Sequence, residues 1–189
     1  MKLALFGGSF DPPHVGHVLA AHYILLTAAV ERVLIVPCGA HAFGKGHASF
    51  SDRLAMCQLA FAHLGSSVEV LDIEGKRSGA SYTIDTVREI LQQRPDAALT
   101  LVIGSDLRAE LPHWKESAEL LQLVKLLTLP RLQENTASTE NAQEVPYYLP
   151  RVSSSGIRAQ LAQGTATNDI RASLPQAVLE YLHKRKLYM

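Results

Sequence analysis

Features that would place this chain in several protein classes are scarce or missing. Lysine plus arginine number 18, as do aspartate plus glutamate, so no basic surplus points to a nucleic-acid partner. Two cysteines, Cys38 and Cys57, are too few for a disulfide scaffold and lack metal-site spacing, which favours a reducing cytoplasm. The N-terminal apolar stretch is too short for a signal peptide, and no apolar run approaches the roughly 20 residues of a membrane span. We therefore expect a cytoplasmic protein that binds neither nucleic acid nor membrane.

What the 189 residues do contain is a regular alternation of short apolar runs and stretches of helical length. Continuous apolar runs are typical of parallel strands covered on both faces. The expected strands are 2–6, 32–37, 68–74, 99–104 and 124–130, and the expected helices are 15–29, 51–64, 83–94, 114–123, 154–163 and 175–186. The pattern predicts a single Rossmann-like α/β domain over 1–189, a doubly wound parallel sheet with helices on both faces.

Local signals refine the ends of these elements. Ser51 is the expected N-cap of helix 51–64, and Ser173 the expected cap of helix 175–186, with Pro175 in its first turn. The polar, aperiodic stretch 131–146 predicts a loop, followed by a short strand at 147–150.

The stretch LFGGSFDPPHVGH (5–17) follows the first strand directly. Gly7 and Gly8 permit positive φ and close approach of a ligand, and the amides of the turn and of the next helix can bind phosphate. His14 and His17, at positions i and i+3, fall on one face of that helix and can donate to a phosphate. Neither G-x-x-x-x-G-K-[ST] nor G-x-G-x-x-G occurs. The alternative is a common Gly-Gly turn with surface histidines.

This stretch resembles the G-x-F-D-x-x-H-x-G-H signature of the nucleotidyltransferase superfamily. The chain as a whole resembles the bacterial nicotinate mononucleotide adenylyltransferase family. Four further stretches carry the resemblance in order along the chain: KRSGASYTIDTVREI (76–90), VIGSDLRAELPHWKE (102–116), VSSSGIRAQL (152–161) and LPQAVLEYLHKRKLY (174–188).

The resemblance implies an ATP site. Ser153, Ser154, Ser155 and Arg158 would hold the β- and γ-phosphates, a role that serine hydroxyls and a guanidinium at a helix start suit physically. The alternative is a serine-capped helix with a solvated arginine. The residues that we assign to ATP by resemblance are Gly7, Gly8, Ser9, Phe10, His17, Gly104, Asp106, Ser153, Ser154, Ser155, Ile157 and Arg158. Asp106 could instead cap the next helix.

The resemblance also implies a mononucleotide site formed by Asp11, Lys45, Ser81, Tyr82, Thr83 and Trp114. Amides at the SYT turn (81–83) can donate hydrogen bonds to the nicotinate carboxylate, and an indole can stack on the pyridine ring. The alternatives are a helix cap by Ser81 or Thr83 and a half-buried packing tryptophan. Trp114 is expected at a helix start.

The main departure from the family lies at 37–50, where His41, Lys45 and His47 stand among glycines in place of a proline-rich loop. Lys45 could still meet phosphate, while a zinc site at His41 and His47 lacks further ligands nearby. The other histidines singled out, His22, His63 and His183, are expected to be structural or solvated.

Taken together, the sequence predicts transfer of AMP from ATP to nicotinate mononucleotide, with His14 and His17 as catalytic residues. Mg²⁺ is expected as cofactor, carried by the phosphates rather than by protein ligands. Alternatives are an adenylyltransferase for nicotinamide mononucleotide or phosphopantetheine, or a nucleotide-binding module without turnover. The sequence does not determine the oligomeric state.

Overall fold

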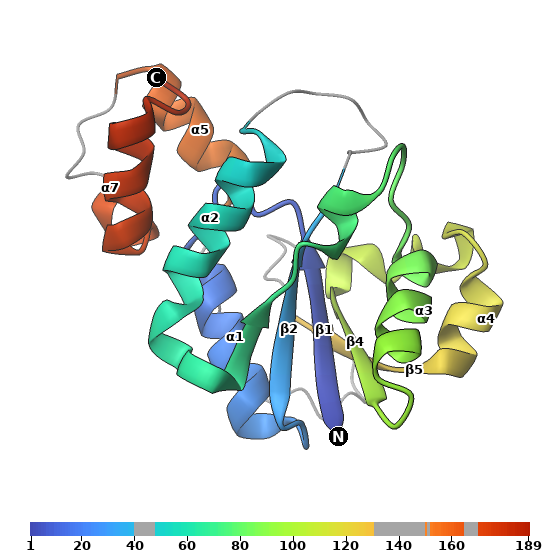
Figure 1. Cartoon of the computed structure of the whole chain (residues 1–189). Coiled ribbons are helices and arrows are strands. Elements are labelled where there is room, and N and C mark those ends of the chain that lie inside the picture. Colours follow the sequence, from blue (N-terminus) through green and yellow to red (C-terminus); the bar gives the residue numbers. More distant parts are fainter. Residues whose placement is uncertain (40–47, 131–149, 151, 165–169) are drawn as a thin grey trace, which may run out of the picture.

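The computed structural model describes residues 1–39, 48–130, 150, 152–164 and 170–189. The predicted loop 131–146 and the segment 147–149 of the predicted strand lie outside these ranges. Five strands form one sheet in the order β3-β2-β1-β4-β5 (Figure 1). All neighbouring strands are parallel, and the central β1 pairs Leu5 with Leu34 of β2 and with Leu101 of β4. The strands are β1 (Lys2–Gly8), β2 (Arg32–Pro37), β3 (Val68–Val70), β4 (Ala98–Gly104) and β5 (Val124–Leu129).

Helices cover both faces of this sheet, which confirms the predicted doubly wound α/β fold. They are α1 (Val15–Thr27), α2 (Phe50–Phe61), α3 (Thr83–Gln93), α4 (Ser117–Leu123), α5 (Ser154–Ala162) and α7 (Gln176–Arg185). Within the described ranges no helix combines the length and apolar character needed to cross a membrane.

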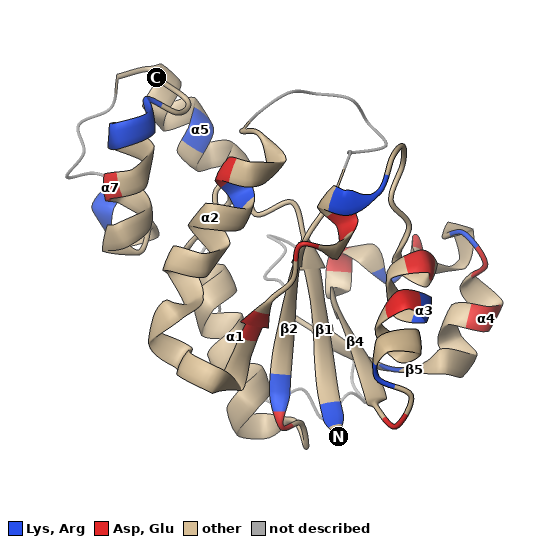
Figure 2. Cartoon of the chain, in the orientation of Figure 1, with Lys and Arg blue, Asp and Glu red and all other residues tan. Residues whose placement is uncertain are grey.

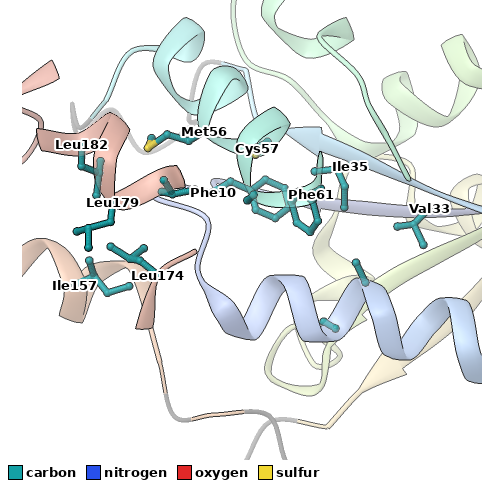
Figure 3. Packing of buried hydrophobic residues seen from close by; sticks show 14 of the residues in the cluster. Phe10, Val33, Ile35, Met56, Cys57, Phe61, Ile157, Leu174, Leu179 and Leu182 are labelled. Carbon is teal, nitrogen blue, oxygen red and sulfur yellow. The ribbon is translucent and has the colours of Figure 1, made fainter. Parts of the chain in front are cut away.

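Alternating strand residues divide the core in two, because successive side chains of a strand point to opposite faces. Ala4, Val33 and Ile35 pack with α1, α2, α5 and α7. Leu3, Leu5 and others pack with α3 and α4 on the opposite face. In Figure 3 the Ile157 side chain of α5 lies near Leu174 and Leu179, so the C-terminal segment is joined to the first core.

Several predicted element ends are wrong. Helix α2 begins at Phe50, so Ser49 and not Ser51 is the N-cap, and its Oγ accepts from the Asp52 N–H at 3.1 Å. Helix α4 begins at Ser117, because Glu116 adopts a left-handed φ of 51° that separates Trp114 from the helix.

The last helix also begins later than predicted. Pro175 is the N-cap of α7 rather than a first-turn residue, and Ser173 lies in a 3₁₀ helix, Arg171–Ser173. Leu174 between them is extended (φ −125°, ψ 141°), as a residue before proline prefers. Similarly, β3 ends at Val70, and Ile73–Lys76 form a 3₁₀ helix where the sequence predicts a strand to 74.

Candidate active site

The loop between β1 and α1 lies at the carboxyl edge of the central strand, where ligands bind in such sheets. Gly7 and Gly8 do not use the positive φ that they permit: both lie in β1, and Phe10 carries the left-handed φ of 47°. Gly8 leaves room for the Phe10 ring, since a Cβ there would lie 3.2 Å from it. The Phe10 side chain is fully buried, so this residue could meet ATP only through its backbone.

His14 and His17 meet at the start of α1, as their spacing predicts. His14 is the N-cap, and the two rings stack with centroids 3.7 Å apart and planes 22° apart. The His14 N–H donates to His17 Nδ1 at 3.2 Å. Since Nδ1 accepts this bond, a neutral His17 ring carries its proton on Nε2 and can donate from there. The edge-on contact with Phe10, at 4.9 Å between ring centroids, further orients His17.

The start of α5 packs against this same loop, although it lies about 140 positions later in the chain. Ser154 Oγ donates to the Pro12 carbonyl at 2.9 Å, and Arg158 Nη1 donates to the Asp11 carbonyl at 2.7 Å. Ser153 caps α5 by accepting from the Gly156 N–H. The alternative of a serine-capped helix is therefore right for Ser153, but the Arg158 side chain is only 21% exposed and is not a solvated arginine.

Ile157 occupies a different position from its neighbours in this motif. Its side chain is buried in the first core, and its N–H bonds the Ser153 carbonyl within the helix. The buried side chain joins α5 to the first core, and the ATP contact that we predicted for Ile157, left to its backbone, stays a prediction.

Asp11 is surrounded by protein groups. Only 3% of the residue is exposed, and its Oδ1 accepts from Tyr188 Oη at 2.5 Å and from the Ala48 N–H at 3.1 Å. Arg158 Nη1 lies 3.6 Å from Oδ2. Burial, followed by the Asp11 hydrogen bond, raises the pKa of Tyr188 well above its ordinary value, so the phenol stays protonated and donates. The carboxylate thus faces protein groups, and the mononucleotide contact expected for Asp11 stays a prediction.

Arg53 is a residue that the sequence argument missed. Its buried guanidinium donates to the Ser9 carbonyl and to the Cys38 carbonyl, both at 2.8 Å, and so ties together the segments that follow β1 and β2. A signal was present in the sequence, because Arg53 stands on the same helical stripe as the buried Met56, Cys57 and Ala60.

Burial, with the nearby Glu74 charge, raises the pKa of the Cys38 thiol to about 11.

Gly104 is the last residue of β4, and Asp106 lies just after it. Because β4 lies beside β1, both stand on the same edge of the sheet. The residue at the N-cap of the 3₁₀ helix Ser105–Leu107 is Gly104. The alternative prediction, that Asp106 caps the next helix, is therefore wrong.

The SYT turn precedes α3. Tyr82 is the N-cap residue and no side chain caps the helix, so the alternative of a cap by Ser81 or Thr83 is wrong. The first intrahelical bond runs from the Asp85 N–H to the Tyr82 carbonyl, which leaves the amides of Thr83 and Ile84 ahead of it without an intrahelical partner. This is the arrangement in which helix starts attract anions.

A network of side-chain hydrogen bonds supports the SYT turn. Arg77 Nη1 donates to Ser81 Oγ at 3.3 Å and to Thr86 Oγ1 at 2.8 Å. Thr86 Oγ1 donates to Glu74 at 2.7 Å, and Glu74 accepts from the Gly39 N–H at 3.0 Å. The turn is thereby connected to the end of β2.

Trp114 does not lie at the start of α4, as predicted, but directly after the 3₁₀ helix Leu111–His113. Its side chain is half-buried against the second core. Its neighbour Lys115 bonds Asp85 at 3.0 Å and lies 4.8 Å from the centre of the Tyr82 ring. The tryptophan segment is thus fastened to the first turn of α3, beside SYT. The alternative of a packing tryptophan agrees with its burial, while a stacking role stays a prediction.

The remaining basic and metal-ligand candidates are placed outside the site or outside the described ranges. Lys45, His41 and His47 lie outside the described residues. His22 and His63 are exposed. Among the described residues no group of three or more histidine, cysteine, aspartate or glutamate side chains could hold a metal ion.

Known proteins resemble this chain in both sequence and fold. Residues 5–160 match the family model described as cytidylyltransferase-like. A protein of Shouchella clausii named "Probable nicotinate-nucleotide adenylyltransferase" is 38% identical, over 99% of this chain and 96% of its own length. A Myxococcus xanthus protein of the same name is 34% identical, over 100% of this chain and 95% of its own.

Solved structures agree on the fold. The nicotinic acid mononucleotide adenylyltransferase of Plasmodium falciparum, complexed with NaAD, superposes with a TM-score of 0.78 at 20% identity, over 99% of this chain and 97% of that one. The same enzyme complexed with APC gives 0.76 at 19% identity, over 99% and 96%. From its own sequence matches, this chain belongs to the cytidylyltransferase-like family and, within it, to the nicotinate-nucleotide adenylyltransferases.

Proposed function

We propose that the protein joins ATP to nicotinate mononucleotide, giving nicotinate adenine dinucleotide and pyrophosphate. The observation that carries the proposal is the convergence of two helix starts on one loop. The stacked rings of His14 and His17 lie at the start of α1. The start of α5 contacts the preceding loop, because Ser154 bonds the Pro12 carbonyl and Arg158 bonds the Asp11 carbonyl. Two helix starts, two imidazoles and a guanidinium provide many donors for a polyphosphate.

In this reaction the acceptor phosphate attacks the α-phosphorus of ATP in line and pyrophosphate leaves. The attacking phosphate is already ionised, so the chain needs no nucleophile of its own. Its contribution is to position the two substrates and to neutralise charge on the transferring group. His17, protonated at Nε2, donates to the α-phosphate, and His14 backs it through the ring stack.

The other predicted ATP residues fall into groups by the part of ATP that each would contact. Ser153, Ser154, Ser155 and Arg158 address the β- and γ-phosphates from α5. Gly7, Gly8 and Ser9 offer a backbone that a ligand can approach closely, and Gly104 with Asp106 borders the adenosine on the neighbouring strand.

The acceptor is held on the other side of β1. The amides at the start of α3 donate hydrogen bonds to the nicotinate carboxylate, and Trp114 stacks on the pyridine ring beside them. The fastening of the tryptophan segment to Asp85 and Tyr82 supports this pairing of ring and carboxylate sites. Lys45 is proposed as a further contact to the acceptor phosphate.

Mg²⁺ is proposed to enter with ATP. The described residues form no group of three or more side chains that could hold a metal ion. The proposal is therefore that phosphate oxygens and water supply most of the Mg²⁺ ligands. When bound, the ion would neutralise charge on the leaving pyrophosphate. We further propose that the chain acts as one domain over 1–189, and that it works in the cytoplasm, where Cys38 and Cys57, both free, stay reduced.

A pyrophosphate-release assay tests the function. Purified protein is given Mg²⁺ and ATP with nicotinate mononucleotide, nicotinamide mononucleotide or phosphopantetheine, and the dinucleotide product is identified by mass. The proposal requires rapid release with nicotinate mononucleotide and formation of nicotinate adenine dinucleotide. ATP binding without release for any acceptor would instead establish a binding module.

A further inference from the structure

The end of the chain reaches back into the phosphate-binding loop. Helix α7 ends in a turn in which the Leu187 N–H bonds the Leu182 carbonyl at 3.1 Å. Lys186 (φ 52°) and Tyr188 (φ 65°) both adopt the left-handed conformation that non-glycine residues rarely use. In Figure 1 this turn lies beside α5. The cost of two such residues indicates that the position of Tyr188 is held by its surroundings.

What holds it is the bond to Asp11, 177 positions earlier. Asp11 in turn contacts the two other segments that converge here. Its Oδ1 also accepts from the Ala48 N–H, just before α2, and its carbonyl accepts from Arg158 of α5. One buried carboxylate and its own carbonyl therefore connect the β1–α1 loop, the entry to α2, the start of α5 and the C-terminal turn.

We propose that Tyr188 is a positioning residue for ATP: through Asp11 it holds Arg158 and the β1–α1 loop in the arrangement that receives the triphosphate. A buried carboxylate keeps its orientation only while its oxygens are satisfied, and the phenol supplies the shortest of these bonds. Without it, Asp11 turns toward Arg158 and draws the guanidinium away from the phosphates. The inference rests on the proposed function for its kinetic readout.

The chain provides a matched control. Tyr181, in α7 itself, donates to Asp52 Oδ1 at 2.9 Å, so a second tyrosine–aspartate bond joins the same C-terminal segment to the start of α2. Neither partner touches the β1–α1 loop in a contact described above. Removing that hydroxyl tests general loosening of the C-terminal segment without disturbing Asp11.

The experiment compares Tyr188→Phe with Tyr181→Phe, each with melting temperature and full kinetics in ATP and in nicotinate mononucleotide. Losing one hydrogen bond to a charged group lowers kcat/KM for ATP about tenfold in Tyr188→Phe, with KM for the mononucleotide unchanged. Tyr181→Phe stays within about twofold of wild type for both substrates, because its bond lies apart from Arg158. An unchanged ATP dependence in Tyr188→Phe, or equal losses in both variants, would overturn the proposal.

A second measurement uses the protein with its own sequence and needs no acceptor substrate. Protein labelled with 3-fluorotyrosine is titrated with Mg·ATP alone and followed by ¹⁹F NMR. The Tyr188 signal shifts on binding, because Arg158 redistributes its bonds between Asp11 and phosphate, while the Tyr181 signal does not. A Tyr188 signal unmoved at saturating ATP contradicts the inference. Because nicotinate mononucleotide is absent, failure of the proposed acceptor is distinguished from failure of this proposal.

Discussion

The two sides of the proposed site are held in different ways. On the phosphate side the supporting bonds are long-range: Arg158 to Asp11 and Ser154 to Pro12 span 147 and 142 positions. On the mononucleotide side they span fewer positions, from four for the bond of Arg77 to Ser81 to 35 for the bond of Gly39 to Glu74. Two helices also differ in charge, since Figure 2 shows acidic and basic residues on α3, whereas α1 carries none.

This difference suits the two tasks. Catalysis of phosphoryl transfer depends on donors fixed before the reaction, and buried contacts between distant segments fix them at the cost of conformational freedom. Acceptor recognition needs an open pocket, and Tyr82 there is 42% exposed. We therefore expect substitutions on the phosphate side to lower turnover or ATP affinity, and substitutions on the other side to affect the mononucleotide with smaller effects.

The largest effect is expected for His17→Ala. Removal of one preorganised donor lowers kcat by a factor of about 100 to 1000. The matched control is His22→Ala in the same helix, an exposed residue whose loss leaves kcat unchanged. Circular dichroism and melting temperature establish that both variants fold. Turnover near the wild-type value in folded His17→Ala would contradict the phosphate-side mechanism.

Arg158→Lys comes next. A planar fork that can bond both the Asp11 carbonyl and phosphate is replaced by a point charge, so KM for ATP rises about tenfold or more, while KM for nicotinate mononucleotide changes little. Arg171→Lys, at an exposed position, serves as control. Unaltered ATP saturation would remove Arg158 from the triphosphate site.

Trp114→Ala probes the other side. Loss of ring stacking and of buried apolar surface weakens both mononucleotides about tenfold, because stacking depends little on the carboxylate. ATP binding and the preference between nicotinate and nicotinamide persist, since the α3 amides remain. Isothermal titration with each ligand separates these effects. A variant that loses ATP binding instead would place the indole in the wrong pocket.

The smallest effect is expected for Thr86→Val, which removes the hydroxyl between Glu74 and Arg77 and keeps the branched shape. A hydrogen bond to a charged group contributes about 1.5–3 kcal/mol to the stability of the turn. Because this hydroxyl acts on the substrate only through the turn, KM for nicotinate mononucleotide rises about two- to tenfold with ATP kinetics unaltered. Thr27→Val is the control, because that hydroxyl bonds the Tyr23 carbonyl within α1. Equal effects of the two variants would remove the network from acceptor binding.

The same comparison explains what the sequence could predict. The strands, their parallel arrangement and the pairing of His14 with His17 follow from local patterns, since apolar runs and an i, i+3 spacing are read along the chain. The bond of Tyr188 to Asp11 leaves no such trace, because nothing local relates residues 177 positions apart. The role of Gly8 leaves no such trace either, since it provides room for the ring of Phe10, which takes the positive φ itself.

Arg53 and Lys115 also show which contacts can be predicted from the sequence and which cannot. Arg53 breaks an otherwise apolar helix stripe, so a search for charged residues on buried faces would have found it. Lys115 follows Trp114 in an exposed segment, and only the packing of that segment on α3 gives it a role. Side chains that act through tertiary contacts are visible in sequence only where they violate a local pattern.

The most direct test of the two-sided site is the ratio of kcat/KM for nicotinate mononucleotide to that for nicotinamide mononucleotide, measured in the wild type at saturating Mg·ATP. A helix start contributes up to about 2 kcal/mol to a bound carboxylate, and hydrogen bonds to its charge about 1.5 to 3 kcal/mol, so the predicted preference for nicotinate is well above tenfold. Equal use of the two mononucleotides would contradict a carboxylate site at the start of α3.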